Sequence, residues 1–320
     1  MHFPWTALTV LFSPLSPLGN TNKPSSSLFS ESPVVTYEVC LSPACIADGA
    51  EQTLEKLHAL APPNVAVCPG VCCSLCGNGP IVLEQDRGPD GRNDGKGYNP
   101  NPDILKKHRK VSGPKVLTLL KLATTNDSKS GKIETEPPQE LVQGYELALQ
   151  ADGLFARKQY AQCVPLYEQA ISLAFRPAIN LQTERDHFLH KKYSDKKESL
   201  APLAWLIRAR RQEAEARLFL ATAGGGSGEY TLESALFAAQ ASCNLSQNTD
   251  AESFQVLADI YQQKKDAVGE VQALQKMFAL ADAAGEEAES KLSFATKNRR
   301  REAGFRLAKL ESEQGIKNSK

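Results

Sequence analysis

Two short stretches decide the fold of this chain: VVTYEVCLSPAC at residues 34–45 and NVAVCPGVCCSLCGNGP at residues 64–80. Each begins with an apolar, β-branched run, which favours a strand, and continues into cysteine, proline and glycine, which favour a loop. Between them, residues 48–61 carry apolar side chains at helical spacing, and Asp48 and Glu51 are spaced as a capping box. The sequence therefore predicts a strand, a helix and a second strand, with cysteines on the loop that follows each strand.

The cysteines are strongly clustered, because six of the eight lie between Cys40 and Cys76. Cys40 and Cys45 lie on the first predicted loop, and Cys72, Cys73 and Cys76 lie on the second. Thiolates from two loops can surround a small cluster or a tetrahedral ion. Glycines between them allow close approach of the backbone, whose amides can donate hydrogen bonds to sulfur. The pattern predicts a thiolate metal site.

The same segment resembles the thioredoxin-like [2Fe-2S] ferredoxins, a family that includes the ferredoxin-like subunit of respiratory complex I. The resemblance covers residues 34–83 and is carried by C-x4-C in the first loop and C-x3-C-G-x-G-P, ending at Pro80, in the second. It implies an α/β thioredoxin-like ferredoxin domain over residues 34–123. It also implies a [2Fe-2S] cluster with Cys40, Cys45, Cys72 and Cys76 as ligands, and Cys73 is the alternative to Cys72.

Other interpretations of the cysteines remain open. A zinc ion held by the same thiols would be structural and chemically inert. A dithiol oxidoreductase would use Cys73 and Cys76, although a thioredoxin-type C-x-x-C belongs after the first strand rather than the second. Structural disulfides would require a secretory leader.

After the second cysteine loop, the chain departs from the ferredoxin pattern. Residues 84–102 are polar and rich in turn-forming residues, which predicts an enlarged loop where the family has a short hairpin. The helix expected next is either 103–110 or 115–123. Residues 124–139 are polar and end in two prolines, as in an interdomain linker.

Residues 140–314 are predicted to form an all-α domain of helical hairpins. Residues 148–173 resemble a tetratricopeptide (TPR) repeat, with a turn at Lys158-Gln159 and a closing proline at Pro177, and a second match begins at Ala251. A weaker hairpin is predicted at 203–223 and 232–245, an insertion at 175–202, and a polar capping helix at 286–314. The resemblance implies a TPR-like solenoid whose groove binds a protein partner; the alternative is a plain helical bundle. Cys163 and Cys243 lie on apolar helix faces and are expected to be buried.

Composition and the N-terminus limit the other possibilities. The 320 residues hold 37 basic and 37 acidic side chains, so no overall field favours nucleic acid. Residues 1–33 are predicted to be a targeting or disordered leader, and their apolar and Ser-rich composition favours a plastid (chloroplast) address. A mitochondrial or cytoplasmic location is the alternative. No membrane span is expected in the mature chain.

The combined prediction is a two-domain electron-transfer adaptor. A [2Fe-2S] cluster would exchange electrons with a redox partner protein, and the helical domain would bind a protein partner. The alternative is an assembly or scaffold protein whose cysteine site is structural, holding zinc, or senses redox state. No catalytic triad, carboxylate dyad or phosphate loop is recognised, so a carrier is expected rather than an enzyme.

Overall fold

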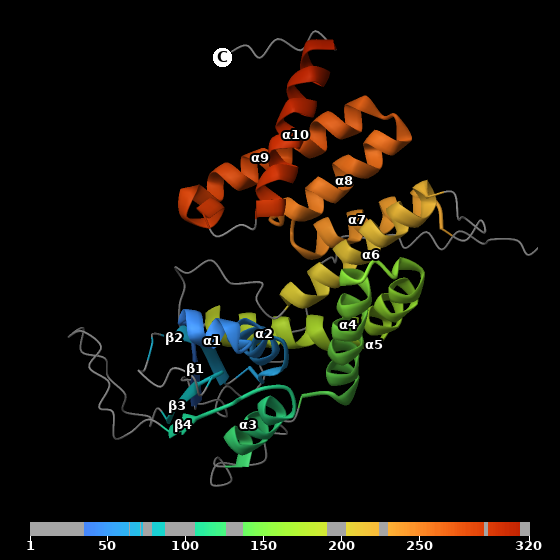
Figure 1. The fold of residues 1–320 in the computed structure, drawn as a ribbon. Helices are drawn as coiled ribbons and strands as arrows, with labels where there is room; N and C mark the ends of the chain where they lie inside the picture. Colours follow the sequence, from blue (N-terminus) through green and yellow to red (C-terminus); the bar gives the residue numbers. More distant parts are fainter. Residues whose placement is uncertain are drawn as a thin grey trace, which may run out of the picture. The chain divides into compact units, whose positions relative to one another are not determined.

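The computed structural model describes residues 35–63, 65–70, 72, 79–86, 106–125, 137–190, 203–223, 230–290 and 294–313. A small four-stranded mixed sheet with its helices comes first in the chain, and a mostly helical region follows (Figure 1). The predicted leader at residues 1–33 lies outside the described residues, as does most of the predicted linker.

The sheet is built on the predicted strand, helix, strand unit, which is confirmed. Its strands are β1 (Val35–Cys40), β2 (Val65–Gly70), β3 (Val82–Asp86) and β4 (Lys106–His108), in the order β2-β1-β3-β4. β1 and β2 are parallel and are joined through helix α2 (Ala50–Leu60), whereas β3 is antiparallel to both β1 and β4. Every residue of β1 is buried, as its apolar, β-branched sequence requires at the centre of a sheet.

Two local predictions in this region are wrong. The first cysteine loop contains a short helix, α1 (Pro43–Ala47), because Pro43 stands at its first position, where a missing N–H and a fixed φ favour helix. Asp48 caps the C-terminus of α1 instead of the N-terminus of α2. The N-cap of α2 is Gly49, whose φ of 92° is a left-handed conformation that glycine adopts without strain.

Of the two helices predicted after the enlarged loop, the later one forms. It is α3 (Pro114–Thr125), whereas Lys106–His108 is a strand. The hydroxyl of Tyr37 on β1 donates to the Leu119 carbonyl of α3 at 2.8 Å, and that of Thr53 on α2 donates to the Val111 carbonyl at 2.7 Å. These buried bonds attach both helices to the sheet region.

The helical region contains the predicted hairpins. Its helices are α4 (Gln139–Ala156), α5 (Tyr160–His190), α6 (Ala204–Thr222), α7 (Leu232–Leu245), α8 (Ala251–Lys264), α9 (Ala267–Ser290) and α10 (Phe294–Glu313). α4 packs against α5, α6 against α7, and α8 against α9 (Figure 1). The turn predicted at Lys158-Gln159 is confirmed, since α4 ends just before it and α5 begins just after it.

The ends of two helices differ from the prediction. Pro177 does not close α5, which continues through it to His190, so much of the predicted insertion at 175–202 is helix. Ala178, Leu181 and Arg185 of this extension are buried, and this packing offsets the cost of an internal proline. The predicted capping helix at 286–314 is divided: Gly285 has non-helical dihedral angles (φ 77°, ψ 172°), the residues after it are helical to Ser290, and α10 begins at Phe294.

Two apolar clusters form the core of the described residues. One extends from the sheet through α2, α3, α4 and α5 into α6, and the other extends from α6 through α7, α8 and α9 to α10. α6 contributes to both clusters, so it connects the sheet region to the last helices. Among the described residues, no helix is both long enough and apolar enough to cross a bilayer.

Candidate metal centre

The first cysteine pair lies at one edge of the sheet. Cys40 is the last residue of β1, and Cys45 lies in the middle of the short helix α1, which follows β1. Both side chains are buried. The Cys40 N–H donates to the Ile81 carbonyl at 3.0 Å, and the Cys40 thiol donates to Ser42 Oγ at 3.5 Å. The Cys40 and Cys45 thiols also hydrogen-bond each other, so they lie together inside the protein, as a ligand pair requires.

The surroundings of this pair favour neutral thiols in the absence of a metal. Burial raises the pKa of the Cys45 thiol above its usual value, and the neighbouring Cys40 thiol raises this pKa further. The Ser42 hydroxyl and the Ile81 N–H act in the opposite direction, because each donates a hydrogen bond to the Cys45 sulfur. These donors would stabilise a metal-bound thiolate at this position.

Gly79 places the end of the second cysteine loop against this pair. A Cβ atom at Gly79 would lie 3.0 Å from Cys45 Sγ and 3.1 Å from an oxygen of the Asp48 carboxylate, so no larger residue fits there without a shift. The close approach that the sequence predicts at this glycine is confirmed. At the other end of the loop, the Leu41 N–H donates to the Gly70 carbonyl at 3.4 Å. Gly70 and Gly79, which flank the second cysteine loop, thus both lie beside residues of the first loop.

The structure describes only part of the second ligand group. Cys72 is exposed, whereas Cys73, Cys76 and Gly77 lie outside the described residues. Within the described ranges, no three His, Cys, Asp or Glu side chains are grouped so that they could hold a metal. The structure therefore brings Cys40 and Cys45 together, and the convergence of the later thiols on them remains a prediction.

Three cysteines lie away from this edge. Cys68, near the middle of β2, is half-buried and its thiol donates to the Tyr37 carbonyl at 3.8 Å. Cys163 and Cys243 are buried within α5 and α7, as predicted, and burial raises the pKa of their thiols to about 11 and about 12. These two thiols are packed as small apolar side chains rather than as ligands.

Sequence reasoning missed a network of half-buried charges that joins α2 to the helical region. Arg208 on α6 forms ion pairs with Glu55 on α2 and, at 2.9 Å, with Asp152 on α4. The hydroxyls of Tyr145 and Tyr167 donate to the same two carboxylates, at 3.1 and 2.8 Å. Burial raises the pKa of Asp152, although Arg208 and the Tyr167 hydroxyl lower it. The sequence signal for this network is the presence of charged residues such as Arg208 on a predicted helix, 203–223, whose other side chains are mostly apolar.

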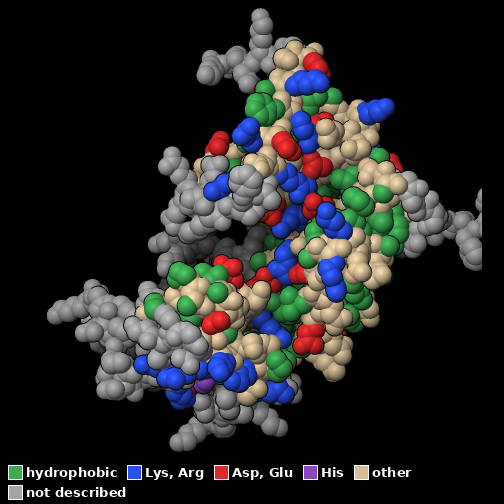
Figure 2. Space-filling model, in the orientation of Figure 1, with side chains coloured by type: hydrophobic (Ala, Val, Ile, Leu, Met, Phe, Trp, Pro, Cys, Tyr) green, Lys and Arg blue, Asp and Glu red, His purple; other side chains and the backbone are tan. Residues whose placement is uncertain are grey.

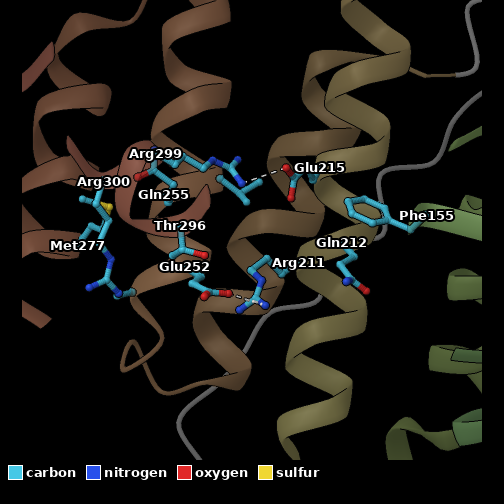
Figure 3. Close-up of a pocket in the computed structure, with 12 residues that line it drawn as sticks. Phe155, Arg211, Gln212, Glu215, Glu252, Gln255, Met277, Thr296, Arg299 and Arg300 are labelled. Carbon is cyan, nitrogen blue, oxygen red and sulfur yellow. Dashed lines mark hydrogen bonds and ion pairs between the residues drawn. The ribbon is translucent and has the colours of Figure 1, made fainter. Parts of the chain in front are cut away.

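The helical region also contains a cavity of about 120 Å³. Its walls come from α4, α6, α8, α9 and α10, and two ion pairs lie across it, Arg211 with Glu252 and Arg299 with Glu215 (Figure 3). Gln255 on its wall is buried, and its Oε1 atom has no hydrogen-bond partner among the described residues. The cavity is lined mainly by charged and polar side chains, whereas the Gln255 Oε1 atom itself is closed off from solvent.

Comparison with known proteins adds no assignment, since no protein-family model, curated protein or solved structure matches this chain.

Proposed function

We propose that the protein is an electron-transfer adaptor, in which a [2Fe-2S] cluster is held at the cysteine edge of the sheet and the helical region binds a protein partner. Cys40 and Cys45 would supply two thiolates, and Cys72 and Cys76 the other two, with Cys73 as the alternative to Cys72. The cluster, when bound, would accept and donate one electron at a time.

One observation carries this proposal: Gly70 and Gly79, which flank the second cysteine loop, both lie at the edge of the sheet where the first thiol pair lies. β1 and β2 are parallel and pair Cys40 with Gly70, so their two loops start side by side. The loop ends at Gly79, in contact distance of Cys45 Sγ. Because Cys76 lies only three residues before Gly79, it can be at most about 11 Å of chain away from that glycine.

The residues that are described suit thiolate coordination. Two buried thiols lie together, and N–H and O–H donors point at the Cys45 sulfur. Since such donors stabilise a thiolate and raise the reduction potential of a cluster bound through it, they suit a redox centre. The order of the strands, a parallel pair joined through a helix and followed by an antiparallel hairpin, supports a thioredoxin-like ferredoxin domain.

The consecutive helical hairpins support a TPR-like solenoid as the partner-binding part. Small buried residues, such as Ala151 and Ala258, allow the close helix packing that stacked hairpins need. The cavity between α6, α8 and α10, which is lined mainly by charged and polar side chains, would take a polar group of the partner.

A second candidate is a structural zinc site on the same cysteines. The full burial of Cys45 favours it, because structural zinc sites are closed to solvent. This reading would make the protein a scaffold, with binding through the helical region as its main activity.

Metal and sulfide analysis of the full chain, purified without oxygen, separates the two candidates. An electron-transfer adaptor should contain about two irons and two sulfides per chain and show a reversible one-electron couple. Colourless protein with about one zinc per chain would refute the cluster and support the scaffold.

Single cysteine-to-serine variants then identify the ligands. Cys40→Ser, Cys45→Ser and Cys76→Ser should each lose most of the iron, and a comparison of Cys72→Ser with Cys73→Ser identifies the remaining ligand. Cys68→Ser is the matched control, because Cys68 lies on β2 and hydrogen-bonds the backbone of β1. Retention of iron in both Cys40→Ser and Cys45→Ser would exclude the proposed site.

A further inference from the structure

A basic face lies on β4 and α3. It consists of Lys106, Lys107, Arg109, Lys110, Lys115 and Lys121, all of them exposed. No Asp or Glu occurs in the sequence between Asp103 and Asp127, so this segment is locally basic in a chain of zero net charge, although Glu84 on β3 pairs with Lys106 at 2.9 Å and with His108 at 2.8 Å. Figure 2 shows Lys and Arg side chains gathered beside a histidine at the lower left of the molecule. The zero net charge conceals this face, because acidic residues elsewhere in the chain balance it.

One part of the basic face, Arg109 and Lys110, lies at the same edge of the sheet as the cysteine pair. Val82 on β3 pairs with Val39 on one side and with His108 on the other, so the end of β4 is level with the end of β1. The Val111 N–H donates to the Pro80 carbonyl at 3.0 Å, next to the glycine that packs on Cys45. Arg109 and Lys110, which directly follow the last residue of β4, therefore lie at the edge where the cluster is proposed.

An exposed apolar side chain lies at the same site. Ile46 follows Cys45 on α1 and is 40% exposed. Protein interfaces place apolar side chains at their centre and polar or charged side chains at their rim. Positive charge also steers a negatively charged partner towards the docking site and fixes its orientation, which suits a brief encounter in which an electron is passed.

We propose that this basic face docks an acidic surface of the redox partner protein, beside the cysteine edge. The inference rests on the proposed electron-transfer function. A protein fits better than nucleic acid, because residues 104–126 contain no Phe, Tyr or Trp on which bases could stack.

Lysines on the outermost strand of a sheet can also serve another purpose, because they prevent that strand from pairing with the sheet of a second molecule. A charge of either sign serves this purpose. An effect that depends on the sign of the charge therefore reports docking.

The first test measures binding of fluorescent poly-L-glutamate to the full chain by anisotropy, at low and high salt. The variant Lys107→Glu/Arg109→Glu/Lys115→Glu reverses three charges of the basic face while keeping charged residues on the edge strand. It should bind the acidic peptide at least about tenfold more weakly than the natural chain at low salt, and high salt should remove the difference.

The matched control is Arg176→Glu/Lys276→Glu/Lys309→Glu, which changes the net charge equally at exposed positions on α5, α9 and α10. This control should bind poly-L-glutamate with little loss. Equal losses in the two triple variants, or no loss in either, would overturn the proposal. A single-stranded oligonucleotide and phosphatidylserine vesicles are measured in parallel. The proposal also fails if the basic-face variant loses binding to either of these probes but not to poly-L-glutamate.

The second test uses protein that carries the cluster, reduced with dithionite and freed of the excess. Hexacyanoferrate(III) takes one electron from the reduced cluster and becomes hexacyanoferrate(II), and tris(phenanthroline)cobalt(III) does the same as a cation. The anionic oxidant should react more slowly with the basic-face variant by about tenfold, and the cationic one should react faster. Identical changes with both oxidants would contradict docking by charge. A chain without iron would refute the proposed function, whereas the peptide test would still decide whether the face binds acidic partners.

Discussion

At the scale of single residues, the atoms around Cys45 are packed so closely that they limit which residues can lie at the cysteine edge. Gly79 lies against the Cys45 sulfur and the Asp48 carboxylate, and the Ile81 N–H donates to the same sulfur. The sequence predicts the close approach of Gly79 from its place in the cysteine motif. It does not predict the cap at Gly49, because Asp48 has the side chain of an ordinary N-cap and the preceding helix α1 was not expected.

Gly79→Ala should disturb the site directly. Its methyl group would meet Cys45 Sγ, so we expect a loss of about 1–3 kcal/mol in the free energy of unfolding and a lower iron content. Urea unfolding and metal analysis measure these two effects. Gly153→Ala is the control, since a Cβ atom there meets nothing within 4 Å and alanine favours helix by up to about 1 kcal/mol. Unchanged stability and iron content in Gly79→Ala would contradict the described packing.

At the scale of elements, α6 connects the other helices through its arginines. Arg208 pairs with carboxylates on α2 and α4, Arg211 with residues at the start of α8, and Arg217 with Glu168 on α5. The helical period of α6 predicts that a helix forms, but it does not predict which carboxylates, far away in the sequence, these arginines meet. The same holds for α5, whose extension past Pro177 depends on packing that no local pattern contains.

Arg208→Met should destabilise the protein more at pH 7.5 than at pH 5. Without the guanidinium, burial would raise the pKa of Asp152 further above its unfolded value, so stability would be lost as the pH rises through that range. At pH 7.5 we expect a loss of about 2–3 kcal/mol, below that of a fully buried pair because the Arg208 side chain is 23% exposed.

Urea unfolding at the two pH values tests this dependence. Arg176→Met is the control at an exposed position of α5, and it should change stability by less than about 0.5 kcal/mol. A loss in Arg208→Met that is the same at both pH values would show that the charge of Asp152 is not the cause.

At the scale of the whole molecule, the sheet region and the helical region share a continuous apolar core. Arg185 near the end of α5 adds to this connection, because its guanidinium donates to the carbonyls of His58, at 2.7 Å, and Ala61 at the C-terminus of α2. The polar composition of residues 124–139 predicts a linker between separate domains. The described parts of the two regions also contact each other directly through this core and these hydrogen bonds.

We therefore expect the chain to unfold in a single cooperative transition. Leu57→Ala on α2 and Leu274→Ala on α9 should each lower the stability of that one transition by about 2–5 kcal/mol, since both side chains are fully buried. Calorimetry checks this through the agreement of the calorimetric and van't Hoff enthalpies. Two separate transitions, each shifted by only one of the variants, would show that the regions fold independently.

The sequence by itself determines the strand, helix, strand unit, the position of most helices and the burial of Cys163 and Cys243. These features follow from hydrophobic periodicity and turn chemistry, which act between residues close together in the chain. Only the tertiary structure decides that the end of β4 lies level with the cysteine pair, that Arg208 meets Glu55 and Asp152, and that α5 continues through Pro177. Such contacts join residues that are distant in sequence, and their energies depend on burial and charge pairing that exist only once the chain has folded.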